Sequence, residues 1–354
     1  PLATDHLGVI WKSASGLVQY LQMEDGKASF YIGADSDDAT KIKQGNAVIG
    51  AYDADGELIW SWHIWATDYD PDAEGGTVDF NGYTLMNRNL GALANDNSTT
   101  DKILASYGLY YQWGRKDPFP AAPTLTGTTA TVGAPIYDGD NNEIKITNSS
   151  QSSTADNNLA FAIANPTVCL SNYAQFNTSR DWLQADMSND ALWGNPKGAE
   201  RNETNDFLNK GAKSFYDPCP VGWRVPPADV FRNFTASGGY AWVIDDFDIA
   251  DISGDGAKSL ADYDYGWTFN LSDSASSYFP AAARFDGSYA MLMGSMSGLW
   301  GSYWGNAPYP GDMFQGGAYS VLSFQIKDTA GNEMITTSPA GGGARADAYS
   351  VRCI

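Results

Sequence analysis

The sequence contains few cysteines and histidines, and this limits the kinds of site that it can form. Its three cysteines, Cys169, Cys219 and Cys353, do not build a zinc site of the Cys₂His₂ or Cys₄ type when His6 and His63 are the only histidines. They allow one disulfide with one thiol left over. A serine–histidine–aspartate triad is unsupported for the same reason, so we expect His63 to be a hydrogen-bonded structural residue.

Positive charge and long hydrophobic runs are also scarce. The chain has 42 acidic and 21 basic residues, a net charge of −21, and no cluster of lysine and arginine longer than a pair. This argues against a nucleic-acid partner. No run of about 18 apolar residues could span a membrane as a helix. The opening "PLATDHLGVI" has no initiator methionine or apolar leader. We therefore expect a trimmed piece of a longer precursor, with any signal peptide or lipid anchor in the removed part.

Aromatic residues and glycines are abundant instead. Counts of 12 Trp, 20 Tyr, 15 Phe and 37 Gly are typical of a globule rich in β-strands and loops. Short β-branched and aromatic segments separated by Gly- and Asp-containing turns predict an antiparallel β unit over residues 1–75. Such a sheet needs a partner for its apolar face. That partner is either the segment that follows or a preceding part of the precursor that completes a sandwich.

A second unit, residues 76–354, follows the acidic stretch "TDYDPDAEGG". It opens with the strand "GYTLMNRNLGAL" and closes with the strands "SYFPAAARF", "GLWGSYWGN", "AYSVLSFQI" and "AYSVRCI". Polar residues from 124 to 158 indicate surface loops or a small hairpin. The predicted helices run from Ile103 to Gly114, over Ser179–Leu192, and from Pro226-Pro227 onwards with Val230, Phe231 and Phe234 facing inward.

Five motifs of this second unit occur in the order found in one known family. They are "LMNRNLGA", "YGLYYQWGR", "CPVGWRVPPADVF", "YFPAAARF" with "LWGSYWG", and "SVRCI". Together they resemble the Fibrobacter succinogenes major paralogous domain, a C-type-lectin-like module of secreted and surface proteins of Bacteroidetes. The resemblance covers residues 79–354, with insertions at about 124–214 and 235–277. The segment "NAVIGAYDADGELIWSWHIW" is similar to segments that precede this module in fimbrillin-like and cell-adhesion proteins.

The resemblance implies an α+β fold, in which an N-terminal antiparallel β unit is followed by a C-type-lectin-like domain with long loop insertions. The first and last strands of that domain are expected to pair. The resemblance also places Cys219 and Cys353 at the two motif cysteines and so implies a disulfide between them. A disulfide that closes a loop of about 134 residues stabilises the fold by about 4 to 5 kcal/mol in the chain-entropy model. Cys169 is then a small buried apolar residue.

Enzymatic alternatives have little support. A nucleophilic Cys219 would need activation, but Pro218 and Pro220 stiffen it and no histidine is near in sequence. The C-type-lectin-like superfamily also includes the formylglycine-generating enzymes, which need two juxtaposed cysteines for copper. Here one of the two usable cysteines is assigned to the disulfide, and the "RGGSW" motif of those enzymes is absent. No segment singles out a pair of carboxylates for glycoside hydrolysis. We therefore expect no catalytic residues.

The stretch "DISGDGAKSLAD" is the clearest candidate for a metal site. Asp251, Ser253, Asp255 and Asp262 occupy positions 1, 3, 5 and 12 of a twelve-residue loop with glycine at position 6. This spacing is typical of a loop that wraps Ca²⁺, the only cofactor that the sequence suggests. The alternative is a polar loop organised by Asx turns, in which aspartate side chains accept bonds from nearby backbone N–H groups.

A second candidate site lies in "LWGSYWGNAPYPGDMF". Flat aromatic rings beside amides and carboxylates suit the faces of sugars, whereas Trp300 and Trp304 are expected in the core. The residues predicted to be exposed and to contact a ligand are Tyr303, Asn306, Tyr309 and Asp312.

These observations predict a non-enzymatic protein of the extracellular space or the outer-membrane surface. We expect adhesion or ligand binding, with a glycan or a host or bacterial surface protein as the partner. The insertions at 124–214 and 235–277 are the first candidates for the binding face, because long loops on a rigid scaffold often carry recognition. The alternative is a fimbrial or pilus component that assembles by strand exchange at the edges of the N-terminal sheet. An enzyme is the third possibility.

Overall fold

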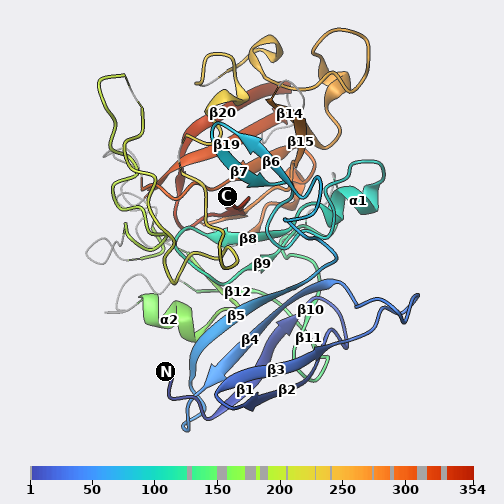
Figure 1. The fold of residues 1–354 in the computed structure, drawn as a ribbon, viewed down its shortest axis with the longest axis vertical. Helices are drawn as coiled ribbons and strands as arrows, with labels where there is room; N and C mark the ends of the chain where they lie inside the picture. Colours follow the sequence, from blue (N-terminus) through green and yellow to red (C-terminus); the bar gives the residue numbers. More distant parts are fainter. Residues whose placement is uncertain are drawn as a thin grey trace.

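The protein is built mainly from β-strands, as the composition predicted (Figure 1). Strands account for 36% of the structure and helices for 9%. None of the described helices is long and apolar enough to cross a membrane. The computed structural model describes residues 2–125, 130–149, 158–171, 181–183, 190–204, 206–227, 229–239, 241–272, 275–287, 291–308, 317–327 and 333–354.

Residues 1–75 contain short antiparallel strands joined by turns, as the sequence predicted. The β2–β3 turn has Asp25 at φ 51° and Gly26 at φ 72°, the left-handed conformation that a two-residue hairpin requires. Val48 and Ile49 are adjacent on one strand and therefore face opposite sides of the sheet. The strands are β1 (His6–Lys12), β2 (Val18–Glu24), β3 (Lys27–Ile32), β4 (Gly45–Tyr52) and β5 (Leu58–Ala66).

Both faces of this sheet are covered. On one face Ile49 packs in a cluster with the β2–β3 hairpin. On the other face Trp11 and Val48 join a larger cluster with Leu109 and Tyr111 of the second unit. The segment that follows the N-terminal unit therefore supplies the expected partner for the apolar face.

The sheet also crosses the predicted boundary at residue 75. Its strand order is β11-β10-β1-β4-β5, so β5 forms one edge. Strands β10 (Ile136–Tyr137) and β11 (Glu143–Ile144) come from the polar insertion, and Lys12 pairs with Tyr137. The expected small hairpin in this insertion is confirmed, and it extends the N-terminal sheet.

The second unit contains an eight-stranded sheet around a short central strand, β21. The order is β17-β16-β21-β18-β19-β20, and β8 also pairs with β21 and with β9. The predicted closing strands are confirmed. The bounds are β8 (Leu109–Gln112), β9 (Phe119–Pro120), β16 (Phe285–Asp286), β17 (Met291–Leu292), β18 (Trp300–Tyr303), β19 (Gly317–Lys327), β20 (Glu333–Ala344) and β21 (Ala348–Ser350).

Shorter strand pairs complete the unit. The first and last segments of the domain lie side by side, as the resemblance implied, because the N–H groups of Met86 and Leu90 donate to the carbonyls of Cys353 and Val351 at 2.9 and 2.8 Å. The pairs are β6 (Thr77–Phe80) with β7 (Tyr83–Met86), β12 (Thr147–Ser149) with β13 (Val168–Leu170), and β14 (Gly266–Ser272) with β15 (Ala275–Pro280).

The predicted helix from Ile103 to Gly114 is wrong in its second half. Helix α1 (Thr100–Ala105) ends early, Gly108 adopts φ 73°, and β8 starts at the next residue. All four residues of β8 are buried. A strand that is buried on both faces has apolar residues at consecutive positions. Such a run also contains apolar residues at helical intervals, so their spacing alone does not distinguish the strand from a helix.

The structure also differs from the other two helix predictions. Among the described residues after Pro226-Pro227, a 3₁₀ turn at Arg232–Phe234 stands in place of the predicted helix, although Val230, Phe231 and Phe234 are buried as predicted. The sequence did not predict helix α2 (Asn158–Ala164). Most of Ser179–Leu192 lies outside the described residues, and the parts described there are not helical.

Candidate functional site

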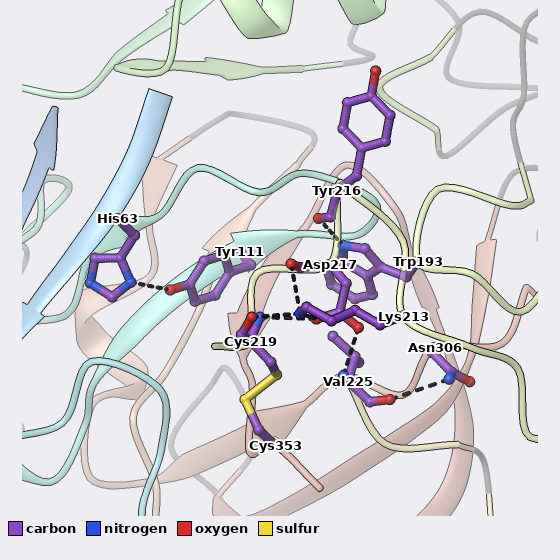
Figure 2. Close-up of a disulfide and its surroundings, with 10 residues drawn as sticks. All are labelled: His63, Tyr111, Trp193, Lys213, Tyr216, Asp217, Cys219, Val225, Asn306 and Cys353. Carbon is purple, nitrogen blue, oxygen red and sulfur yellow. Dashed lines mark hydrogen bonds and ion pairs between the residues drawn. A yellow bond between two sulfur atoms is a disulfide. The ribbon is translucent and has the colours of Figure 1, made fainter. Parts of the chain in front are cut away.

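A disulfide joins Cys219 to Cys353 across 134 residues of sequence (Figure 2). This confirms the pairing that the resemblance implied. Both cysteines are buried, and the bond ties the loop of residues 214–223 to the C-terminal end of the chain. The remaining cysteine, Cys169, is a buried thiol whose pKa is raised to about 12 by burial. It therefore stays protonated at neutral pH, as expected of a core residue.

A buried carboxylate fixes the shape of this loop. Asp217 accepts hydrogen bonds from the backbone N–H groups of Cys219 and Val225, each at 2.9 Å. Its third partner is the Lys213 ammonium, also at 2.9 Å (Figure 2). Burial raises the pKa of Asp217, and the Lys213 charge opposes that shift. One side chain thus holds both ends of the turn that carries the disulfide.

The loop forms one wall of an open cleft of about 590 Å³, and β5 forms the opposite wall. Prolines at 71, 218 and 220 and the Cys219 side of the disulfide also line it. We call this feature the aromatic cleft because its walls include Trp60, Trp62, Trp65, Tyr69, Phe215 and Trp223.

The rim of the aromatic cleft exposes large apolar side chains. Phe215 is 90% exposed and Val221 is 96% exposed, and Trp62 of β5 is 38% exposed. Because the disulfide and two prolines stiffen the loop, these side chains are held at the surface at little further entropic cost. Exposed apolar groups gathered around a concave site are typical of a binding surface.

The basic residue in the cleft is already paired. The Lys116 ammonium lies 2.8 Å from Asp117 and 4.6 Å from the centre of the Trp60 ring. Ser61 donates a hydrogen bond to Asp117 at 2.5 Å and accepts one from Lys116. Burial lowers the pKa of Lys116, and the Asp117 charge opposes that shift. The salt bridge favours the charged form of Lys116, in which the ammonium donates to both Ser61 and Asp117.

His63 connects β5 to the core of the second unit. Its Nε2 lies 2.9 Å from Asn46 Oδ1, and the Tyr111 hydroxyl donates to Nδ1 at 3.4 Å (Figure 2). Both contacts suit one neutral tautomer, in which Nε2 carries the proton. Burial lowers the pKa of His63 to about 4, against the opposing effect of Asp117. The prediction of a hydrogen-bonded structural histidine agrees with these contacts.

Two of the predicted ligand contacts are buried, so their expected exposure is wrong. Tyr303 donates to the Pro280 carbonyl at 2.7 Å, and Asn306 donates to the Val225 carbonyl at 3.2 Å (Figure 2). Tyr303 lies on β18 inside the eight-stranded sheet, where both faces are covered. Tyr309 and Asp312 lie outside the described residues. Trp304 is buried in the core, as predicted, whereas Trp300 is only half-buried.

The predicted calcium loop is organised by its own hydrogen bonds. Asp251 accepts from the N–H groups of Gly254 and Gly256 at 2.6 and 2.8 Å. Asp262 accepts from those of Ser253 and Ser259 at 3.0 and 2.9 Å. Asp255 likewise accepts from the Ala257 N–H. In the described ranges no three His, Cys, Asp or Glu side chains form a group that could hold a metal ion. These contacts favour the Asx-turn alternative.

Sequence reasoning missed the aromatic cleft, although its segments had drawn attention separately. "WSWHIW" and "SFYDPCPVGW" each carry an unusual density of aromatic residues and prolines. Nothing in either segment indicated that the two face each other, because about 150 residues separate them in the chain. Comparisons with protein families, curated proteins and solved structures found no match to this chain. The family resemblance therefore stays a prediction, and the site is argued from its geometry.

Proposed function

We propose that this is a non-enzymatic adhesion or ligand-binding protein with a C-type-lectin-like second domain, and that it binds a glycan or a surface protein in the aromatic cleft. The observation that carries the proposal is the preformed aromatic wall facing a disulfide-fixed loop with exposed Phe215 and Val221. Aromatic side chains offer large contact areas and lose little conformational entropy on binding.

The state of the polar groups in the cleft supports binding over catalysis. Asp217, Lys116 and His63 each use their polar atoms in hydrogen bonds or ion pairs within the protein. General acid–base catalysis requires a group whose pKa lies near the working pH and that reaches the substrate. The disulfide supports an oxidising location, which fits the extracellular space or the outer-membrane surface.

Screening of immobilised glycans and peptides tests this proposal. Trp65→Ala and Phe215→Ala, on opposite walls, are each expected to weaken binding of any ligand that the wild-type protein retains, by at least about tenfold. Tyr31→Ala is the matched control, since Tyr31 is an exposed aromatic residue on β3 that does not line the cleft. Equal binding by the wild-type protein and both cleft variants would refute the proposed site.

A second candidate is the assembly role, which the position of β5 at the edge of its sheet favours. An edge strand offers backbone N–H and C=O groups to a strand from another chain. Sedimentation velocity over a wide range of protein concentrations distinguishes the two. Growing polymers support assembly, whereas a monomer at every concentration leaves ligand binding as the function of the cleft.

A further inference from the structure

An acidic loop forms one side of the aromatic cleft. Thr67, Tyr69 and Pro71 line the cleft, and the residues that alternate with them are charged. Asp68 and Asp70 are exposed between these lining residues, and the exposed Asp72 and Glu74 follow directly in the chain. We call these four carboxylates the acidic rim; they are Asp68, Asp70, Asp72 and Glu74.

The acidic rim is only partly neutralised by the protein itself, through the Arg88 charge, which acts on Asp68. Among the described residues, no salt bridge joins any of the four carboxylates to a lysine or arginine. Arg88 is the nearby cation, and it lies over the Tyr69 ring at 4.2 Å. The basic groups elsewhere around the cleft, Lys116 and Lys213, are paired with Asp117 and Asp217. The rim therefore keeps a net negative charge, on a chain whose net charge is −21.

We propose that the aromatic cleft binds a basic polypeptide segment of a partner protein. Apolar side chains of that segment enter between β5 and the loop of residues 214–223, and its lysines or arginines face the acidic rim. This inference rests on the proposed function, because it requires the cleft to be the binding site. Complementary charge raises the association rate and excludes partners of the wrong sign, while the aromatic rings attract the cationic groups directly.

The acidic rim narrows the range of partners. Acidic glycans and acidic peptides would meet repulsion from its carboxylates.

Isothermal titration calorimetry with three synthetic peptides tests the inference. The first repeats lysine, leucine and serine; the second replaces each lysine with glutamate, and the third replaces each lysine with glutamine. The wild-type protein is expected to bind the lysine peptide at least about tenfold more tightly than the other two, and added salt should weaken that binding. Equal affinity for the lysine and glutamine peptides would overturn the inference.

Two variants with the same change in charge test whether the acidic rim is responsible for the preference for the lysine peptide. The quadruple change D68N, D70N, D72N and E74Q is expected to remove most of the preference for the lysine peptide. The control E24Q, D25N, D35N and D37N removes the same charge from the β2–β3 hairpin and the loop after it, outside the cleft lining, and should change nothing. Asp70 accepts the Asp72 N–H at 2.9 Å, so the double change D68N and E74Q keeps the test valid if the quadruple variant does not fold.

The two proposals fail in different ways. If the rim variants keep the wild-type preference while Trp65→Ala and Phe215→Ala lose binding, the cleft is the site and the basic partner is refuted. If the cleft variants bind every peptide and glycan as the wild-type protein does, the cleft itself is refuted as the site.

Discussion

Removal of the disulfide should cost the fold a large part of its stability. The bond between Cys219 and Cys353 closes 134 residues, and the chain-entropy relation then gives a loss of about 5 kcal/mol in the free energy of unfolding. With an unfolding entropy scaled to 354 residues, this corresponds to a fall in Tm of about 7 °C. Both sulfur atoms are buried, so alanine at both positions also removes some packing.

Urea denaturation followed by tryptophan fluorescence measures this loss. The variant with Cys219→Ala and Cys353→Ala is compared with the wild-type protein, with and without reductant, and Cys169→Ala serves as the control for loss of a buried sulfur. Reductant should destabilise the wild-type protein and leave the double variant unchanged. A double variant within about 1 kcal/mol of the wild-type protein would refute the argument that loop closure stabilises the fold.

Three further predictions concern other groups. His63 has a pKa of about 4 in the fold against 6.5 in an unfolded chain, so the unfolded chain binds the proton first as the pH falls. Stability should therefore drop by at most about 3 kcal/mol between about pH 6.5 and pH 4, and His63→Gln should lose this drop in urea titrations. Arg352 is fully buried, donates twice to Asn89 Oδ1 and lies 3.7 Å from the Phe279 ring centre. The substitution Arg352→Lys should therefore destabilise the fold by about 3 kcal/mol in the same urea titrations. A loss below about 1 kcal/mol would contradict this prediction. Calcium or a chelator should leave the Tm unchanged, because the carboxylates of Asp251–Asp262 bind loop N–H groups; a rise in Tm with calcium would restore the metal site.

Local signals predicted much of the fold. Alternating aromatic and β-branched residues with Asp-Gly turns predicted the strands β1 to β5. These signals are local, because each strand and turn is specified by residues that are neighbours in the sequence. The disulfide followed from two motif cysteines. The strand β8 did not follow, because its burial on both faces comes from β9, β21 and the N-terminal sheet.

The candidate site was less predictable for a related reason. Tyr303 looked like an exposed ring in a polar, aromatic segment, but its position inside a sheet is set by strands far along the chain. The aromatic cleft likewise exists only where β5 meets the disulfide loop. Side-chain exposure and concavity arise from tertiary contacts, which the local pattern of one sequence does not contain.

The central claim is that ligands bind in the aromatic cleft, and hydrogen exchange with bound ligand tests it most directly. Exchange is measured for the free protein and for the protein saturated with the ligand that binds most tightly in the screen of immobilised glycans and peptides. We predict slower exchange in β5 and in residues 214–223. Protection confined to the insertion at 235–277, with β5 and residues 214–223 unchanged, would contradict the claim.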